Sequence, residues 1–132
     1  MPVKIKYAND GTGVYMDYHG TVTGNDIFDV VRSIFTDCRF SSIQFWLSDR
    51  TKVTNFDVST EVTVAIGKMS AVYLKENPDL IIALVSPTDI EFAMSRMMEL
   101  QANSANPFLV CRSRAEAEEW IVKNRKGEPM PT

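Results

Sequence analysis

Charged and hydroxyl side chains suited to anion binding follow three of the predicted strands. Because the carboxyl ends of parallel strands and the starts of the following helices meet at one sheet edge, we expect these side chains to lie near one another. Arginine guanidinium groups bind carboxylates and phosphates at such places. One hypothesis is therefore an anion site; the alternative is that the hydroxyl residues cap helices and the arginines are solvated. The set comprises Asp49, Arg50, Ser86, Thr88, Arg112, Ser113 and Arg114.

A group of methionines in one predicted helix gives a second candidate site, an apolar pocket for a lipid-like ligand. Met94 and Met97 fit the inward stripe of that helix, whereas Met98 lies about 100° further round. Methionine is flexible and adapts to irregular apolar ligands. Ordinary core packing with one surface methionine explains the same spacing, and both interpretations stay open.

Residues for metal binding or nucleophilic catalysis are scarce. His19 is the only histidine, and Cys38 and Cys111 form no Cys/His cluster, so we expect no metal. Both cysteines adjoin apolar residues and are expected to be buried, reduced thiols. The sequence contains neither a nucleophile-elbow motif nor a glycine-rich phosphate loop. We therefore expect no enzyme activity and no cofactor.

The first half of the chain reads as a β-hairpin, a helix and a third strand. Apolar residues alternate over residues 3–7 and 14–18, and Asn9-Asp10-Gly11 between them favours a turn. Thr23, with Asp26 as a weaker capping-box partner, precedes an amphipathic stripe from Ile27 to Phe35. A third strand is expected over residues 43–47, ending at 48–50, followed by an irregular stretch over residues 51–56.

The second half alternates helices and strands. Asp57 or Ser59 is expected to cap a helix with its apolar stripe at Val62, Ala65, Ile66, Met69, Val72 and Tyr73. Residues 80–85 are continuously apolar, as in a central parallel strand. A capping box at Thr88 opens a helix with Ile90, Ala93, Met94, Met97 and Leu100 inward. A strand over residues 107–112 and a last helix, capped by Ser113, follow.

This order predicts an α/β fold: an N-terminal hairpin followed by right-handed β-α crossovers, with a mixed, mostly parallel five-stranded sheet and about four helices. The 132 residues predict a single domain over 1–124. Residues 125–132 contain two prolines and a glycine and are expected to form a flexible tail.

Composition excludes some classes of partner. The formal net charge is −3, from 14 basic and 17 acidic side chains, so we expect no nucleic-acid partner. The longest apolar run is far shorter than the roughly 20 residues that span a bilayer. We therefore expect a cytoplasmic protein.

Four segments resemble the SpoIIAA-like (STAS-like) family of small bacterial domains. Residues 19–23 with Asp26 resemble the family's helix entry, and residues 48–50 its acidic strand end. Residues 92–97 (Phe-Ala-Met-Ser-Arg-Met) and 115–121 (Ala-Glu-Ala-Glu-Glu-Trp-Ile) are similar to its last two helices. The resemblance implies a β/α superhelical fold, no established enzymatic activity and regulation through protein contacts. It also implies a possible phosphorylation switch at Ser59, although capping a helix is the simpler role for that serine.

Both faces of the predicted parallel strands are apolar, so both need cover. If most helices lie on one face, a second copy of the chain or a partner protein would cover the other, with Trp46 as an anchor. The alternative is that a helix crosses to that face and Trp46 belongs to the core. The leading hypothesis is thus a non-catalytic regulatory or protein-interaction domain, and the alternative is a binding protein for a small anionic or lipid-like ligand.

Overall fold

The computed structural model describes residues 2–132. These residues form five strands, four α-helices and one 3₁₀ turn. They are β1 (Val3–Tyr7), β2 (Gly13–Thr23), α1 (Gly24–Phe35), β3 (Phe45–Asp57), α2 (Thr60–Tyr73), η1 (Leu74–Glu76), β4 (Ile81–Val85), α3 (Asp89–Ala102), β5 (Phe108–Cys111) and α4 (Arg114–Asn124).

The strands form one mixed sheet in the order β1-β2-β3-β4-β5. β1 and β2 are antiparallel and are joined by a tight turn, where Gly11 has a φ of 76° that favours glycine. All the other neighbouring strands are parallel. The α/β fold class, the opening hairpin and the five-stranded sheet with four helices are therefore confirmed.

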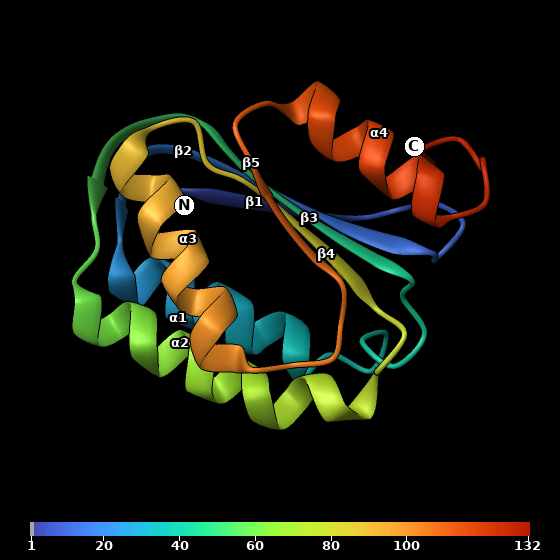
Figure 1. The fold of residues 1–132 in the computed structure, drawn as a ribbon, viewed down its shortest axis with the longest axis horizontal. Coiled ribbons are helices and arrows are strands. Elements are labelled where there is room, and N and C mark those ends of the chain that lie inside the picture. The colour runs from blue at the N-terminus through green and yellow to red at the C-terminus, as the bar shows by residue number, and fades with distance from the viewer. Residues whose placement is uncertain (1) are drawn as a thin grey trace.

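The sheet lies between two helical layers. Helices α1, α2 and α3 cover one face, and α4 covers part of the other (Figure 1). On the first face, Trp46, Ile82 and Leu84 pack against α1, α2 and α3; on the second, Phe45, Leu47 and the alternate residues of β4 pack under α4. Trp46 is 5% exposed and packs on the first face under α1, α2 and α3, so the predicted interface anchor belongs to the core. The second face is covered in part by α4, which packs over the other core cluster.

Side-chain caps fix where each helix begins. Thr23 and Asp26 close the reciprocal capping box of α1. Ser59, rather than Asp57, caps α2, and Thr88 and Ser113 cap α3 and α4. The caps expected from the sequence thus place the helix starts correctly.

The third strand is longer than the sequence predicts. β3 continues to Asp57, and its second part pairs with residues 19–23 of β2. A register shift near Gly20, whose φ is 66°, allows this pairing to continue. Residues 51–57 lack a regular apolar pattern because they extend beyond β4 and are largely exposed, so the expected irregular stretch is in fact strand.

Helix α3 turns a different face to the core than its apolar pattern predicts. Its buried residues are Glu91, Ser95 and Ala102, whereas Ile90 is 57% and Leu100 is 69% exposed. On α2, Ala65 and Val72 are likewise exposed instead of inward. The inner side of α3 contacts small and polar side chains of the core, so hydrophobicity alone selects the wrong face. Cys38, expected to be buried, is exposed in the turn after α1, whereas Cys111 is buried.

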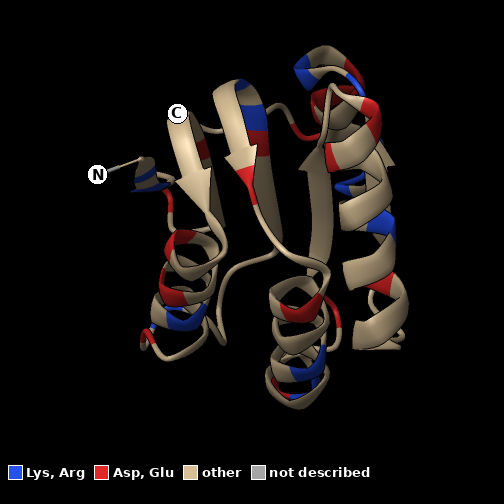
Figure 2. Cartoon of the chain, turned by 90° about the vertical axis from the view of Figure 1, so that its left-hand side faces the viewer, with Lys and Arg blue, Asp and Glu red and all other residues tan. Residues whose placement is uncertain are grey.

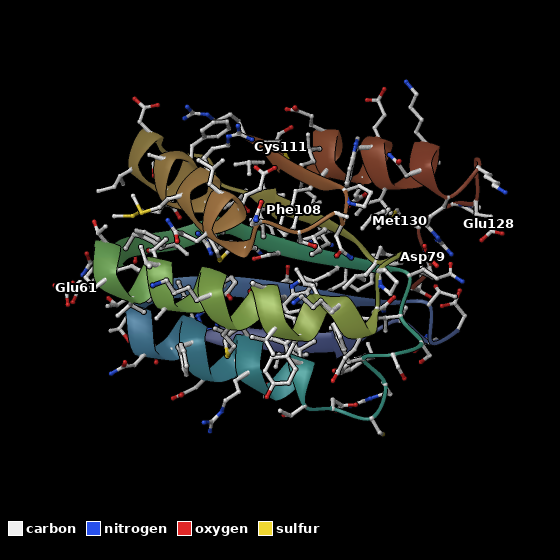
Figure 3. All side chains as sticks on the ribbon, turned by 60° about the horizontal axis from the view of Figure 1, so that its bottom comes forward. Glu61, Asp79, Phe108, Cys111, Glu128 and Met130 are labelled. Atoms are coloured by element: carbon white, nitrogen blue, oxygen red, sulfur yellow. The ribbon has the colours of Figure 1, made fainter. Side chains whose placement is uncertain are left out.

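The last residues pack against the hairpin instead of forming the loose tail expected from composition. The Asn9 amide donates to the carbonyl of Thr132 at 2.8 Å, and the Tyr15 hydroxyl donates to the carbonyl of Pro131 at 2.5 Å. Met130 packs against the core cluster under α4 (Figure 3). The tail therefore helps α4 to cover the second face of the sheet.

Candidate functional site

Arg114 lies at the centre of an ion-pair cluster on the α4 side of the sheet. Its guanidinium contacts Asp17 at 2.9 Å, Asp49 at 3.0 Å and Glu118 at 2.9 Å. Burial would raise the pKa of Asp49, but hydrogen bonds from the Thr51 amide and from Arg114 outweigh it and lower that pKa. An open groove beside this cluster also carries Lys4, His19 and Lys52. Because three carboxylates already surround Arg114, it is poorly suited to bind a further anion.

Arg112 is engaged at the start of α3. It donates to Asp89 at 2.8 Å and to the carbonyl of Pro87 at 3.2 Å, and it lies over the ring of Phe92. Thr88 and Ser113 nearby use their hydroxyls as helix caps. The caps match the alternative in which Thr88 and Ser113 begin helices, whereas Arg112 is paired with Asp89 and not simply solvated.

Arg50 lies on the opposite side of the sheet, beneath α3. It is 4% exposed, and its side chain donates to the Ser95 hydroxyl at 3.1 Å. The Ser95 hydroxyl in turn lies 2.7 Å from that of Ser86, which is fully buried. Within residues 2–132, Nε of Arg50 has no hydrogen-bond partner.

The three arginines therefore do not form one anion site. Successive residues of a strand point to opposite faces, so Asp49 pairs with Arg114 on one side while Arg50 enters the other. Of the predicted set, the structure brings together Asp49 with Arg114, and Arg50 with Ser86. Arg112 is held separately by Asp89.

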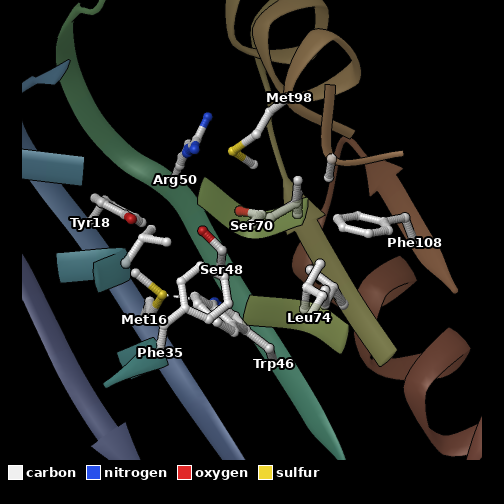
Figure 4. A pocket seen from close by; sticks show the side chains of 14 residues that line it. Met16, Tyr18, Phe35, Trp46, Ser48, Arg50, Ser70, Leu74, Met98 and Phe108 are labelled. Carbon is white, nitrogen blue, oxygen red and sulfur yellow. Dashed lines mark hydrogen bonds between the residues drawn. The ribbon is translucent and has the colours of Figure 1, made fainter. Parts of the chain in front are cut away.

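A small cavity lies next to Arg50, between the sheet and the helices (Figure 4). Its volume is about 30 Å³, and most of its lining is apolar. Tyr18, Ser48 and Ser70 contribute hydroxyls. Burial raises the pKa of Tyr18 to about 12, although the charge of Arg50 opposes this shift, so the phenol is neutral at physiological pH. The apolar lining includes Met16, Val31, Phe35, Trp46, Leu74, Ile82, Leu84, Met98, Ala102 and Phe108.

Met97 and Met98 of α3 do not lie where the sequence pattern places them. Met98, expected at the surface, lines this cavity and packs against the core. Met94 lines a second cavity of about 10 Å³ that Arg50 and Met98 also border. Met97, expected inward, is half-exposed and lines neither cavity. The reason is that α3 turns a different face to the core than its apolar pattern predicts.

Sequence reasoning missed Tyr18, Glu91 and Ser95 as companions of Arg50. Glu91 and Ser95 are one helical turn apart, and Met98 and Ala102 continue the same face. This helical spacing is the sequence signal that could have identified the inner face of α3. Because Glu91 and Ser95 are polar, the hydrophobic pattern instead favoured the face that carries Ile90 and Leu100. Ser59, the possible switch, is exposed and accepts from the Val62 amide at 3.2 Å as the cap of α2. A switch at Ser59 stays a prediction.

The described chain shows neither a metal cluster nor a membrane-spanning helix. Among residues 2–132, no group of three or more His, Cys, Asp or Glu side chains is placed to hold a metal ion. No helix in this part of the chain has the length and apolar character needed to cross a bilayer.

The fold is that of a SpoIIAA-like α/β domain. No protein-family model matches the sequence, and no curated protein matches it either. An uncharacterised DUF3478-family protein with a SpoIIAA-like fold, from Shewanella loihica PV-4, superimposes with a TM-score of 0.53 at 15% identity, covering 89% of this chain and 90% of its own. The Bacillus cell fate determinant SpoIIAA in its phosphorylated form gives a TM-score of 0.57 at 13% identity, covering 90% and 98%. The likeness confirms the SpoIIAA-like fold that the sequence motifs imply.

Proposed function

We propose that the chain is a non-catalytic protein-interaction domain of regulatory type, and that the outer face of α3 is its contact surface. The observation that carries this proposal is an outward apolar stripe on α3, in which Ile90, Ala93 and Leu100 are exposed and Met97 is half-exposed. The fold likeness supports the class of function, because the SpoIIAA-like resemblance implies regulators that act through protein contacts.

The spacing of the stripe indicates the kind of partner. Its residues are three, four and three positions apart, the spacing with which a helix packs along another helix. Lys, Arg, Asp and Glu are interspersed over the helices without a face of one sign (Figure 2), so surface charge does not select a nucleic acid. The partner we infer contributes an amphipathic helix.

Site-specific photo-crosslinking in the source cells tests this proposal. A benzoylphenylalanine in place of Leu100 should give one discrete protein adduct, and Ile90→Glu should abolish it. Val72→Glu is the matched control, because Val72 is 66% exposed on α2, and should leave the adduct unchanged. An adduct between two copies would identify a homodimer. No adduct, or one that survives Ile90→Glu, would contradict the proposal.

A second candidate function, small-ligand binding, is favoured by a different observation. Arg50 is a buried cation without a carboxylate partner in the described chain. Co-purified ligand, detected by native mass spectrometry of freshly purified protein, tests it.

A further inference from the structure

Arg50 has a buried charge that no carboxylate of the described chain contacts directly. No carboxylate of residues 2–132 lies within 4.0 Å of its guanidinium. Arg125, which is also buried, differs because it pairs with Glu128 at 3.2 Å. A guanidinium stays protonated in proteins, and buried charges are normally paired. Arg50 is therefore the group at which an anion from outside the chain would be most strongly stabilised.

The contacts that Arg50 does make leave binding capacity unused. The rings of Tyr18 and Phe56 lie 5.5 and 5.4 Å from its guanidinium carbon and attract the cation. The Tyr18 hydroxyl also interacts with the guanidinium, but neither side chain supplies a negative charge. Of the side-chain nitrogens, Nη1 donates to Ser95, while Nε has no acceptor within residues 2–132.

Glu91 is the acidic residue that shares this environment. It is 2% exposed, and one carboxylate oxygen accepts from the Thr88 hydroxyl while the other has no partner in the described chain. Its charge acts on Arg50 without direct contact. Glu91 is thus a weak internal substitute for an anion, and an incoming anion would be repelled by it.

The cavity beside Arg50 determines what such an anion must look like. Its polar end carries Tyr18, Ser48 and Arg50, and Trp46 and Phe108 are among its apolar walls (Figure 4). Leu84 also lines it. At about 30 Å³ it has room for a small group only. Met98 lines both this cavity and the smaller one near Met94, and a methionine side chain is flexible enough to change the space between them.

We propose that this cavity binds a small amphiphilic monocarboxylate, with the carboxylate on Arg50 and a short apolar chain against Trp46, Leu84 and Phe108. The proposal rests on the second candidate function and gives it a ligand class and a site. It is independent of the outer face of α3, because Met98 and Ser95 lie on the inner face.

Calorimetric titration and thermal unfolding with straight-chain acids test the proposal. Acids from acetate to octanoate are compared with hexanol and octanol as uncharged analogues. The wild type should bind the acids with an affinity that rises with chain length until the cavity is filled, and its melting temperature should rise with ln(1 + [L]/Kd). The alcohols should bind much more weakly.

Variants separate the charge from the cavity. Arg50→Met should weaken binding of the acid by about 10- to 100-fold, the usual loss for a hydrogen bond to a charged group. Arg112→Met is the matched control and should bind like the wild type, because Arg112 is an exposed arginine that is absent from the cavity lining. Glu91→Gln should bind the acid more tightly, because it removes the competing negative charge.

A fluorescence experiment covers the case in which Arg50→Met does not fold. In Trp120→Phe, Trp46 is the only tryptophan, and a brominated hexanoic acid should quench it at the concentrations found by calorimetry. Equal binding of acids and alcohols, unchanged binding in Arg50→Met, or calorimetric binding without quenching of Trp46 would overturn the proposal. Absence of binding to every acid in the series would overturn it as well, while leaving the protein-interaction proposal untouched.

Discussion

Arg114 connects α4 to the sheet through carboxylates of β2, β3 and its own helix. Among these, Asp49 is the most buried, with a side chain 9% exposed. Burying a carboxylate is costly unless it is paired. For Asp49 the hydrogen bonds and the charge of Arg114 outweigh the cost of burial, since the pKa of Asp49 is lowered in the folded protein.

Asp49→Asn should reduce the free energy of unfolding by about 1–3 kcal/mol at pH 7, the usual value for hydrogen bonds to charged groups. Because the folded-state pKa lies below the unfolded value of about 3.9, the stabilisation is complete above that pH and is lost as the pH falls through the folded-state pKa. Urea denaturation at pH 7 and in acid should show the gap between wild type and variant closing.

Asp37→Asn is the control for that experiment. Asp37 pairs with Arg39 at 2.9 Å, but the arginine side chain is 54% exposed, so solvent screens the pair and its loss should change stability much less than Asp49→Asn does. A pH-independent effect of Asp49→Asn would show that the Arg114 cluster does not stabilise the fold.

The limits of sequence reasoning at this scale are seen in the arginines. The placement of Arg112 and Arg114 just after β5 is predictable from the alternation of apolar and polar segments, whereas Arg50 lies within β3, next to the point where its pairing with β4 ends. Which face each one enters depends on strand register and on the bulge in β2, neither of which a periodic pattern specifies. The pairing of Arg50 with Ser95 is a long-range contact with no local signature.

At the scale of elements, helix starts were predictable because a cap is a short-range interaction. Ser59 is the example with a functional alternative. Ser59→Ala should lower the free energy of unfolding by about 1 kcal/mol, since the Val62 amide loses its acceptor. Ser59→Asp should restore the cap and the midpoint of urea unfolding. If both variants lose stability equally, the serine has a role other than capping.

Gly67 sets the distance between α2 and α3. A Cβ there would lie 2.5 Å from Cβ of Gln101 and 2.9 Å from the Met98 carbonyl oxygen, so α3 would have to shift. Gly67→Ala should therefore destabilise by about 1–2 kcal/mol, because overpacking outweighs the gain in helix propensity. Lys68→Ala, at an exposed position of α2, should be nearly neutral in the same unfolding experiment. A more stable Gly67→Ala would show that the two helices separate easily.

The close approach of α2 and α3 also explains why the inner face of α3 was not predictable from the sequence. The buried residues Glu91, Ser95 and Ala102 are small or polar, because this side of α3 lies close to α2 and to Arg50. The apolar residues of the helix therefore mark its solvent-facing side and not its core side. A helix with an apolar outer stripe conflicts with the rule that apolar residues face the core. Such conflicts between local pattern and fold are expected at functional surfaces.

At the scale of the whole molecule, the second face of the sheet is closed by α4 and the tail together. Removing residues 127–132 should lower the free energy of unfolding by several kcal/mol, at about 1 kcal/mol for each lost hydrogen bond. The losses include the hydrogen bonds to Asn9, Tyr15 and Arg125, the ion pair of Arg125 and the contact of Met130. Tyr15→Phe, which removes only the hydrogen bond to Pro131, should account for about 1 kcal/mol of it. An unchanged urea midpoint after truncation would mean that the tail is detached in solution.

The extension of β2 and β3 beyond the sheet has a consequence for how the molecule opens. The described pairings of β1 stop at Tyr18 and those of β4 at Asp49, so within the sheet the backbones of residues 19–23 and 52–57 pair only with each other. Two-stranded segments of this kind open in local fluctuations of low free energy. Deuterium should therefore replace the amide protons of this ribbon long before those of Trp46–Ser48. Because α1 and α2 begin directly after its two strands, each such fluctuation would loosen the first turns of both helices at once.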